Sequence, residues 1–101
     1  MLAERIARAF GPERIVLFGS HAWGTPHAYS DVDLLVVLPF EGRSTAKALE
    51  ILRAVDAPFA VDLIVYTPER LRERLAQNDF FLLDIMQRGR VLYDAAHAGV
   101  G

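Results

Sequence analysis

The chain has 101 residues, of which 52% are hydrophobic, with a formal net charge of −2 and no cysteine. This length suits one domain with a modest core, and the hydrophobic content is too high for a disordered chain. The slightly acidic balance argues against nonspecific nucleic-acid binding, and the lack of cysteine excludes disulfides, thiolate zinc sites and cysteine nucleophiles.

The first half of the chain is predicted to form a helix and two strands. Apolar residues at helical spacing predict an amphipathic helix over 2–10, which a Gly-Pro pair ends. Two short apolar runs, residues 14–18 and 32–38, are typical of buried strands. Between them, residues 21–24 are predicted to begin a short helix.

The second half is predicted to contain three helices and two strands. In order they are a helix over 44–55 capped by Ser44, a strand over 60–66, a helix that Thr67-Pro68 begins and that ends near Asn78, a helix over 78–88 closed by Gly89, and a strand over 91–93. The alternation indicates an α/β (or α+β) domain with helices on one or both faces of a small sheet. We assign the domain to residues 1–94 and expect 95–101 to be a disordered tail.

Neither a membrane segment nor a secretion signal is expected. No stretch approaches the ~18 apolar residues that a membrane span requires. The start of the chain, MLAERIARAF, is charged and lacks the apolar run of a signal peptide. We therefore expect a cytoplasmic protein without membrane contact.

The first candidate site residues are Asp31 and Asp33, in the segment SDVDLLVV. Side chains alternate across a strand, so both carboxylates point to the same face. Two like charges on an apolar strand repel each other, and a divalent cation would relieve this by taking carboxylate oxygens as ligands. The D-x-D pattern alone is common, and a strand end exposed to solvent is the alternative.

A third aspartate, Asp62, lies within the apolar run AVDLIVY. This run resembles a central strand, in which an unpaired charge costs several kcal/mol. No Lys or Arg lies within five residues of Asp62. We therefore expect Asp62 to face Asp31 and Asp33 across adjacent strands, where the three carboxylates would share one or two Mg²⁺ ions. A hydrogen-bonded structural aspartate at a strand edge is the alternative.

Gly19 and Ser20 follow the first predicted strand. Glycine permits a tight turn and a close backbone approach, and free N–H groups at a following helix would suit a phosphate. The chain contains neither G-x-x-x-x-G-K-[ST] nor G-x-G-x-x-G, so a Walker-type ATPase and a Rossmann fold are not supported. The G-x-S-x-G elbow is also absent, so Ser20 is not expected to be a hydrolase nucleophile.

In combination these motifs are more specific. The segment LFGSHAWGTPHAYSDVDLLVVL, with Asp62 on a later strand, resembles the signature of the polymerase-β-like nucleotidyltransferase superfamily. The similarity is greatest to the minimal nucleotidyltransferases, and MQRGRVLYD resembles the end of those proteins. The resemblance implies a small mixed sheet of about four strands flanked by helices.

The resemblance also implies a reaction and roles for the site residues. Gly19 and Ser20 would hold the β- and γ-phosphates of an NTP, expected to be ATP. Asp31, Asp33 and Asp62 would bind Mg²⁺ or Mn²⁺, and Asp62 would help to deprotonate an attacking hydroxyl. The reaction would transfer a nucleoside monophosphate, expected to be AMP, and release pyrophosphate. The acceptor and the base of the NTP stay open, and relatives often carry Arg at the positions of His21 and Trp23.

The resemblance further implies a protein partner, because minimal nucleotidyltransferases are often paired with a helical HEPN protein in toxin–antitoxin-like systems. The alternative function is an antitoxin-like binding protein that acts by contact, with a weak or vestigial nucleotide site. The run from Phe80 to Met86 is too continuous in apolar residues for one helix face. It favours a homo-oligomer or a helical partner, unless the domain buries that helix itself.

Overall fold

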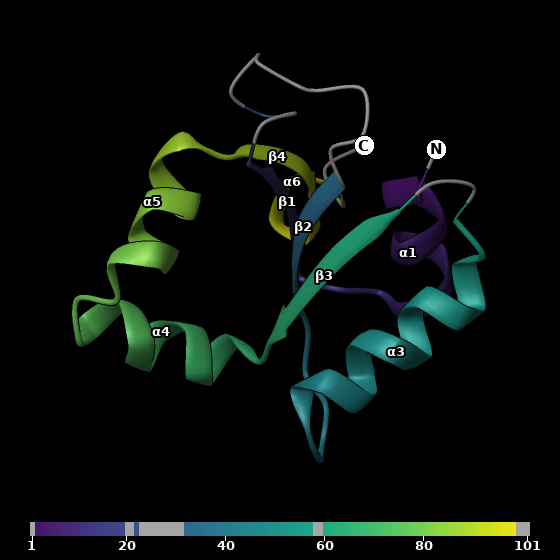
Figure 1. Ribbon diagram of the computed structural model, residues 1–101, viewed down its shortest axis with the longest axis horizontal. Helices are drawn as coiled ribbons and strands as arrows, with labels where there is room; N and C mark the ends of the chain where they lie inside the picture. Colours follow the sequence, from purple (N-terminus) through teal and green to yellow (C-terminus); the bar gives the residue numbers. More distant parts are fainter. Residues whose placement is uncertain (1, 20–21, 23–31, 58–59, 99–101) are drawn as a thin grey trace.

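The computed structural model describes residues 2–19, 22, 32–57 and 60–98 (Figure 1). Its elements are, in chain order, α1 (Leu2–Phe10), β1 (Arg14–Phe18), β2 (Val32–Val37), α3 (Ser44–Val55), β3 (Val61–Tyr66), α4 (Pro68–Ala76), α5 (Phe80–Arg88), β4 (Arg90–Asp94) and α6 (Ala95–Ala98). No helix within these residues is long and apolar enough to cross a lipid bilayer.

The four strands form one mixed sheet in the order β3-β2-β1-β4. Strand β1 pairs antiparallel with both β2 and β4, whereas β2 and β3 run parallel. Parallel neighbours need a crossover connection, and α3 provides it between β2 and β3. The expected α+β class and small mixed sheet are therefore confirmed.

Helices cover both faces of the sheet. Figure 1 shows α1 and α3 on one side of the strands and α4 and α5 on the other. On the first side, Ile6 and Ile51 pack with Ile15, Leu34 and Val36 from the strands. On the second side, the buried residues are Val16, Phe18, Leu35, Val37, Leu71, Leu82 and Ile85. Alternate residues of β1 and β2 thus enter opposite cores, as period-two alternation requires.

Side-chain caps fix the starts of α4 and α5. The Thr67 hydroxyl accepts a hydrogen bond from the Arg70 amide at 3.1 Å, and Pro68 takes the first helical position, as predicted. At α5, the Asp79 carboxylate accepts from the Leu82 amide at 3.2 Å and forms an ion pair with Arg74 at 2.8 Å. The hydrogen bond from Arg74, together with that from the Leu82 amide, lowers the pKa of Asp79 below its usual value. This pair joins the end of α4 to the start of α5.

Three local details differ from the sequence predictions or add to them. Ser44 is the first residue of α3, and its N-cap is Arg43, which makes no side-chain capping hydrogen bond. Gly89 does end α5, but in extended rather than left-handed geometry. It is needed for space, because a Cβ there would overlap the Ile85 carbonyl and lie 2.6 Å from a Val16 methyl group. In the segment expected to be a tail, residues 95–98 form the short helix α6.

Candidate functional site

Three strand ends lie next to one another at the same end of the sheet. Because β1 is antiparallel to β2 and β3 is parallel to it, the C-terminal end of β1 lies beside the N-terminal ends of the other two. The register pairs Phe18 with Asp33 and Asp33 with Asp62. Gly19 follows Phe18 directly. The sheet therefore brings Gly19, Asp33 and Asp62 together from three separate segments.

The side chains of Asp33 and Asp62 lie on the same face of the sheet. Residues directly opposite each other on neighbouring strands share a face, and those strands are ~4.8 Å apart. Alternation along β2 puts Asp33 on the face of Leu35 and Val37, which α4 and α5 cover. Two of the three predicted carboxylates are thus neighbours on one face.

The environment of Asp62 differs from the sequence expectation. Strand β3 lies at the edge of the sheet, not at its centre, and Asp62 is exposed to solvent. The expectation that Asp62 is a buried charge in need of a partner is therefore wrong. Asp33 is half-buried on β2, between β1 and β3. The pairing of the two aspartates follows from the strand register and not from burial of Asp62.

Gly19 is in close contact with the Asp33 carboxylate. Its φ of +78° lies in the left-handed region, which residues with a side chain rarely adopt. A Cβ added at Gly19 would overlap the Asp33 carboxylate oxygen Oδ2 and lie 3.2 Å from Cγ. The Ala22 amide donates a hydrogen bond to the Gly19 carbonyl at 3.1 Å, and Ala22 is helical. Ala22 lies within residues 21–24, where the sequence predicts the start of a short helix.

The other predicted site residues, Ser20 and Asp31, lie outside the described residues, as do His21 and Trp23. Among the residues that are described, no group of three or more potential metal ligands is found. Asp33 and Asp62 nevertheless offer adjacent carboxylate oxygens, which are the donors that Mg²⁺ and Mn²⁺ prefer. Alternation from Asp33 would place Asp31 on the same face, so it stays the predicted third ligand.

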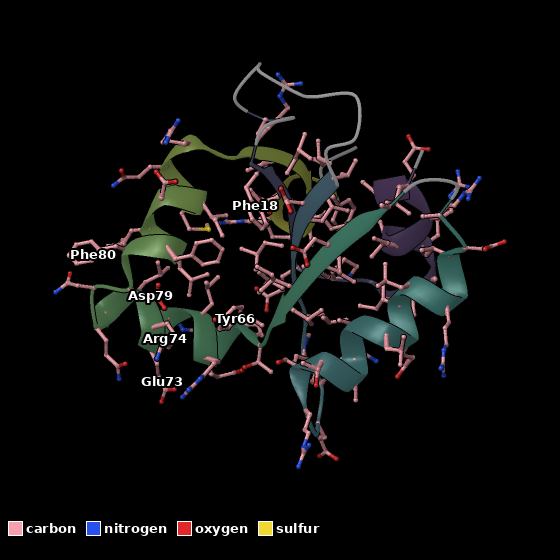
Figure 2. The ribbon with its side chains drawn as sticks, viewed as in Figure 1. Phe18, Tyr66, Glu73, Arg74, Asp79 and Phe80 are labelled. Atoms are coloured by element: carbon pink, nitrogen blue, oxygen red, sulfur yellow. The ribbon has the colours of Figure 1, made fainter. Side chains whose placement is uncertain are left out.

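The structure adds an aromatic pair that the sequence analysis did not assign to the site. The rings of Phe18 and Phe81 meet edge to face, with centroids 5.9 Å apart and an interplanar angle of 88°. Phe18 is the register partner of Asp33, whereas Phe81 comes from α5. Figure 2 shows Phe18 at the sheet and Phe80 on the outer side of α5. Sequence spacing could not reveal the contact, because it depends on how α5 packs on β1.

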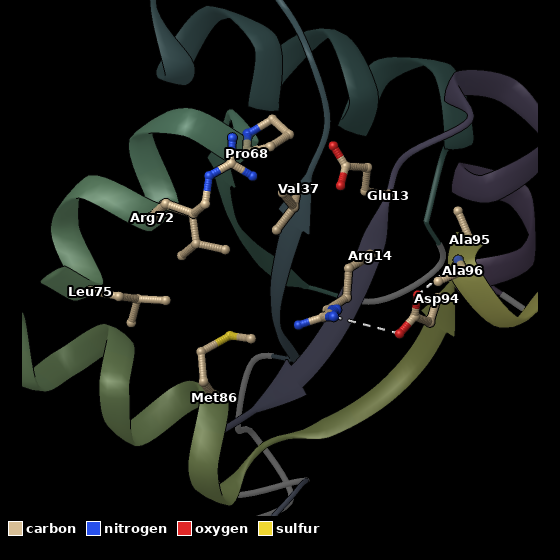
Figure 3. Close-up of a pocket in the computed structure, with 11 residues that line it drawn as sticks. Glu13, Arg14, Val37, Pro68, Arg72, Leu75, Met86, Asp94, Ala95 and Ala96 are labelled. Carbon is tan, nitrogen blue, oxygen red and sulfur yellow. Dashed lines mark hydrogen bonds and ion pairs between the residues drawn. The ribbon is translucent and has the colours of Figure 1, made fainter.

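Cavities elsewhere in the described structure do not contain these carboxylates. One of about 290 Å³ lies at the other end of the sheet, where Arg14 and Val37 are located (Figure 3). Arg14 points into it and lies 3.6 Å from Asp94, and Arg72 adds a second cation to the lining. Of its two acidic residues, Glu13 and Asp94, the second forms an ion pair with Arg14, and no glycine lines the cavity. The cluster of Gly19, Asp33 and Asp62 at the strand ends is therefore the better candidate for a catalytic site.

Comparison with known proteins agrees with this choice. Residues 1–92 match the family model for a nucleotidyltransferase domain. No curated protein matches the chain. Among solved structures, a toxin–antitoxin with AMP-PNP is 25% identical, with a TM-score of 0.59 over 93% of this chain and 72% of that chain.

Two further solved structures share the fold. A putative nucleotidyltransferase from Sulfolobus solfataricus is 21% identical, with a TM-score of 0.55 over 95% of this chain and 77% of that chain. A mutant of the toxin–antitoxin MntA-HpeT is 22% identical, with a TM-score of 0.56 over 92% of this chain and 71% of that chain. Because the family match spans all of the strands but the last residues of β4, the chain belongs to the nucleotidyltransferase domain family and is a transferase.

Proposed function

We propose that this domain transfers a nucleoside monophosphate, AMP from ATP, to a hydroxyl acceptor and releases pyrophosphate. The observation that carries the proposal is the pairing of Asp33 with Asp62 on one face, directly beside the Gly19 turn. The choice of an adenine nucleotide is supported by the similar toxin–antitoxin structure, which was solved with AMP-PNP.

Each predicted site residue would have its own role. The backbone at Gly19, with the hydroxyl of Ser20, would bind the β- and γ-phosphates, because a glycine with positive φ lets a phosphate approach the backbone closely. Asp31, Asp33 and Asp62 would hold Mg²⁺, or Mn²⁺ in its place. Asp62 is exposed on the edge strand, where it can also reach the acceptor hydroxyl and accept its proton.

The residues present fit a divalent cation. Asp33 and Asp62 place two carboxylates on neighbouring strands, and the Gly19 backbone occupies the space next to Asp33 that a side chain would fill. When bound, the cation neutralises phosphate charge and orients the NTP for in-line displacement. The contribution of the chain is to hold the carboxylates and the phosphate-binding turn in fixed positions on a sheet.

A protein partner is part of the proposal. Two similar structures are toxin–antitoxins. In α5, Leu82 and Ile85 are buried within the domain, but Phe80 is 80% exposed on the outer side of the helix. So large an exposed aromatic residue suits contact with a helical HEPN-type protein or a second copy. Sedimentation at micromolar concentration, alone and with the product of the neighbouring gene, tests this; a monomer in both cases contradicts it.

The second candidate function is that of an antitoxin-like protein that neutralises its partner by contact alone. The toxin–antitoxin neighbours are compatible with it. The retention of Asp33 and Asp62 in register favours catalysis, because a site used only for contact has no need of paired carboxylates. The two functions differ in one outcome: Asp33→Asn and Asp62→Asn would leave neutralisation of the partner intact if contact alone is required.

The experiment uses purified protein with Mg²⁺, the partner protein and ATP labelled at either the α- or the γ-phosphate. Label is expected to reach the acceptor from the α-phosphate only, and Asp62→Asn is expected to abolish transfer. Asp94→Asn is the matched control, because it removes a carboxylate at the opposite end of the sheet. Transfer from the γ-phosphate would indicate a kinase-like reaction and contradict the proposal, as would equal activity of the Asp62→Asn and Asp94→Asn variants.

A further inference from the structure

Phe80 and Phe81 are neighbours at the start of α5 but have different surroundings. Phe80 is 80% exposed and lies on the outer side of the helix (Figure 2). Phe81 is 55% exposed, and part of its ring packs edge to face against Phe18. The contact turns Phe81 toward the sheet and leaves about half of the residue open to solvent.

Phe18 connects this exposed ring to the candidate site. It is the last residue of β1, it precedes Gly19, and it lies directly opposite Asp33 in the antiparallel register. Opposite residues on antiparallel strands have Cα atoms ~5 Å apart and point to the same face. The Phe81 ring therefore contacts the register partner of Asp33, on the same face of the sheet.

The helix that carries Phe81 is anchored to the rest of the domain. Asp79 caps α5 at the Leu82 amide and pairs with Arg74, so the first turn of the helix is anchored to the end of α4. Leu82 and Ile85 are fully buried against the sheet and anchor the same helix to it. Because the helix is anchored and the ring contacts Phe18, less side-chain entropy is lost when another flat group stacks on Phe81.

We propose that Phe81 is a stacking platform for the purine base of the nucleotide whose phosphates bind at Gly19. This inference rests on the proposed function and adds a base-binding subsite to it. Stacking on an exposed aromatic ring stabilises a bound base whatever its hydrogen-bonding groups, and a larger ring system gains more from it. Phe81 would therefore favour ATP and GTP over CTP and UTP without reading the base edge.

The test compares binding of Mg²⁺-ATP, Mg²⁺-CTP and Mg²⁺-tripolyphosphate by calorimetry. The variants are Phe81→Leu, which keeps apolar contact with Phe18 but lacks a π face, and Phe81→Tyr, which restores the ring. Phe40→Leu is the matched control, because it makes the same change next to the core on the other face of the sheet. Phe81→Leu is expected to weaken ATP binding about 5- to 150-fold, the range for losing one stacked base at ~1–3 kcal/mol. The loss should be smaller for CTP and absent for tripolyphosphate, which has no base. Phe81→Tyr and Phe40→Leu should bind as the wild type does.

Two results would overturn the inference while leaving the proposed function in place. One is unchanged ATP binding by Phe81→Leu, and the other is an equal loss for ATP and tripolyphosphate, which would mean that Phe81 only supports the fold beside Asp33. Failure of the proposed function has a different signature. In that case Asp33→Asn would not weaken binding of either ligand, or the wild type would bind neither ligand.

Discussion

Replacing Gly19 by alanine perturbs the candidate site in a way that can be separated from backbone strain. Gly19 and Gly42 both have positive φ, +78° and +87° respectively. A Cβ at Gly42 would meet nothing within 4 Å, whereas a Cβ at Gly19 would overlap the Asp33 carboxylate. Both substitutions therefore strain the backbone, and only Gly19→Ala also creates a steric overlap.

The backbone strain is the free energy of holding an L-residue in the left-handed region, ~1–2 kcal/mol. We expect Gly42→Ala to lower the free energy of unfolding by about that amount, a loss that a domain with ~5–15 kcal/mol of stability tolerates. Gly19→Ala should lower it at least as much. Because β2 is hydrogen-bonded on both sides, the Asp33 backbone is fixed and its side chain must turn away from the added methyl group.

The displaced carboxylate is expected to weaken Mg²⁺-ATP binding at least tenfold, which corresponds to ~1.4 kcal/mol. Thermal unfolding with and without Mg²⁺-ATP measures this directly. At a ligand concentration 100 times Kd, the wild type and Gly42→Ala should each gain ~2.7 kcal/mol of stability, and Gly19→Ala should gain clearly less. Equal gains in Gly19→Ala and Gly42→Ala would refute the argument that the Gly19 backbone fits against Asp33.

Three further predictions concern the fold. Gly89→Ala should lower the free energy of unfolding by about 1–3 kcal/mol in urea denaturation, because the added Cβ meets Val16 and the backbone at an ordinary φ of −72°; a neutral result would show that α5 can shift freely. Asp79→Asn keeps an acceptor for the α5 amide but loses the ion pair with Arg74. Because the pKa of Asp79 is lowered in the folded state, its stabilisation is complete above the ordinary pKa of 3.8 and disappears as the pH falls through the lowered pKa. The variant should therefore be less stable than the wild type at pH 7, with a gap that narrows in acid, and a gap that does not change with pH would contradict this. Ile85→Ala should cost ~2–5 kcal/mol in the same assay, whereas Phe80→Ala should stay within ~0.5 kcal/mol of the wild type; similar losses would mean that Phe80 is buried in solution.

Asp62 does pair with Asp33, but for a different reason than the sequence suggested. The sequence pattern VDLIVY suggested a central strand, and burial of a charge was the reason to look for partners. The structure places this strand at the sheet edge, with Asp62 in solvent. Apolar patterning cannot distinguish an edge strand covered on both faces by helices from a central one. What brings Asp62 to Asp33 is the parallel register, which depends on the crossover through α3.

Burial also differs among the residues from Phe80 to Met86. The apolar residues of this run do not fall on one helix face. The sequence therefore allowed either a partner surface or full burial within the domain. In the structure Leu82 and Ile85 enter the core, Leu83 and Met86 are half-buried, and Phe80 and Phe81 remain exposed. One face of α5 is therefore buried within the domain, and a partner surface at the exposed Phe80 and Phe81 stays a prediction.

Local chemistry determined much of this protein from its sequence. The Thr67 cap, the Pro68 start and the strand runs all depend on residues close in the chain. The segment from Gly19 to Asp33 was sufficient to indicate the family. Only the tertiary structure decided the strand order, the exposure of Asp62, the contact between Gly19 and the Asp33 carboxylate, and the position of Phe81 over Phe18. The physical reason is that these features arise from pairing and packing between segments far apart in the sequence, and no local pattern of residues encodes that geometry.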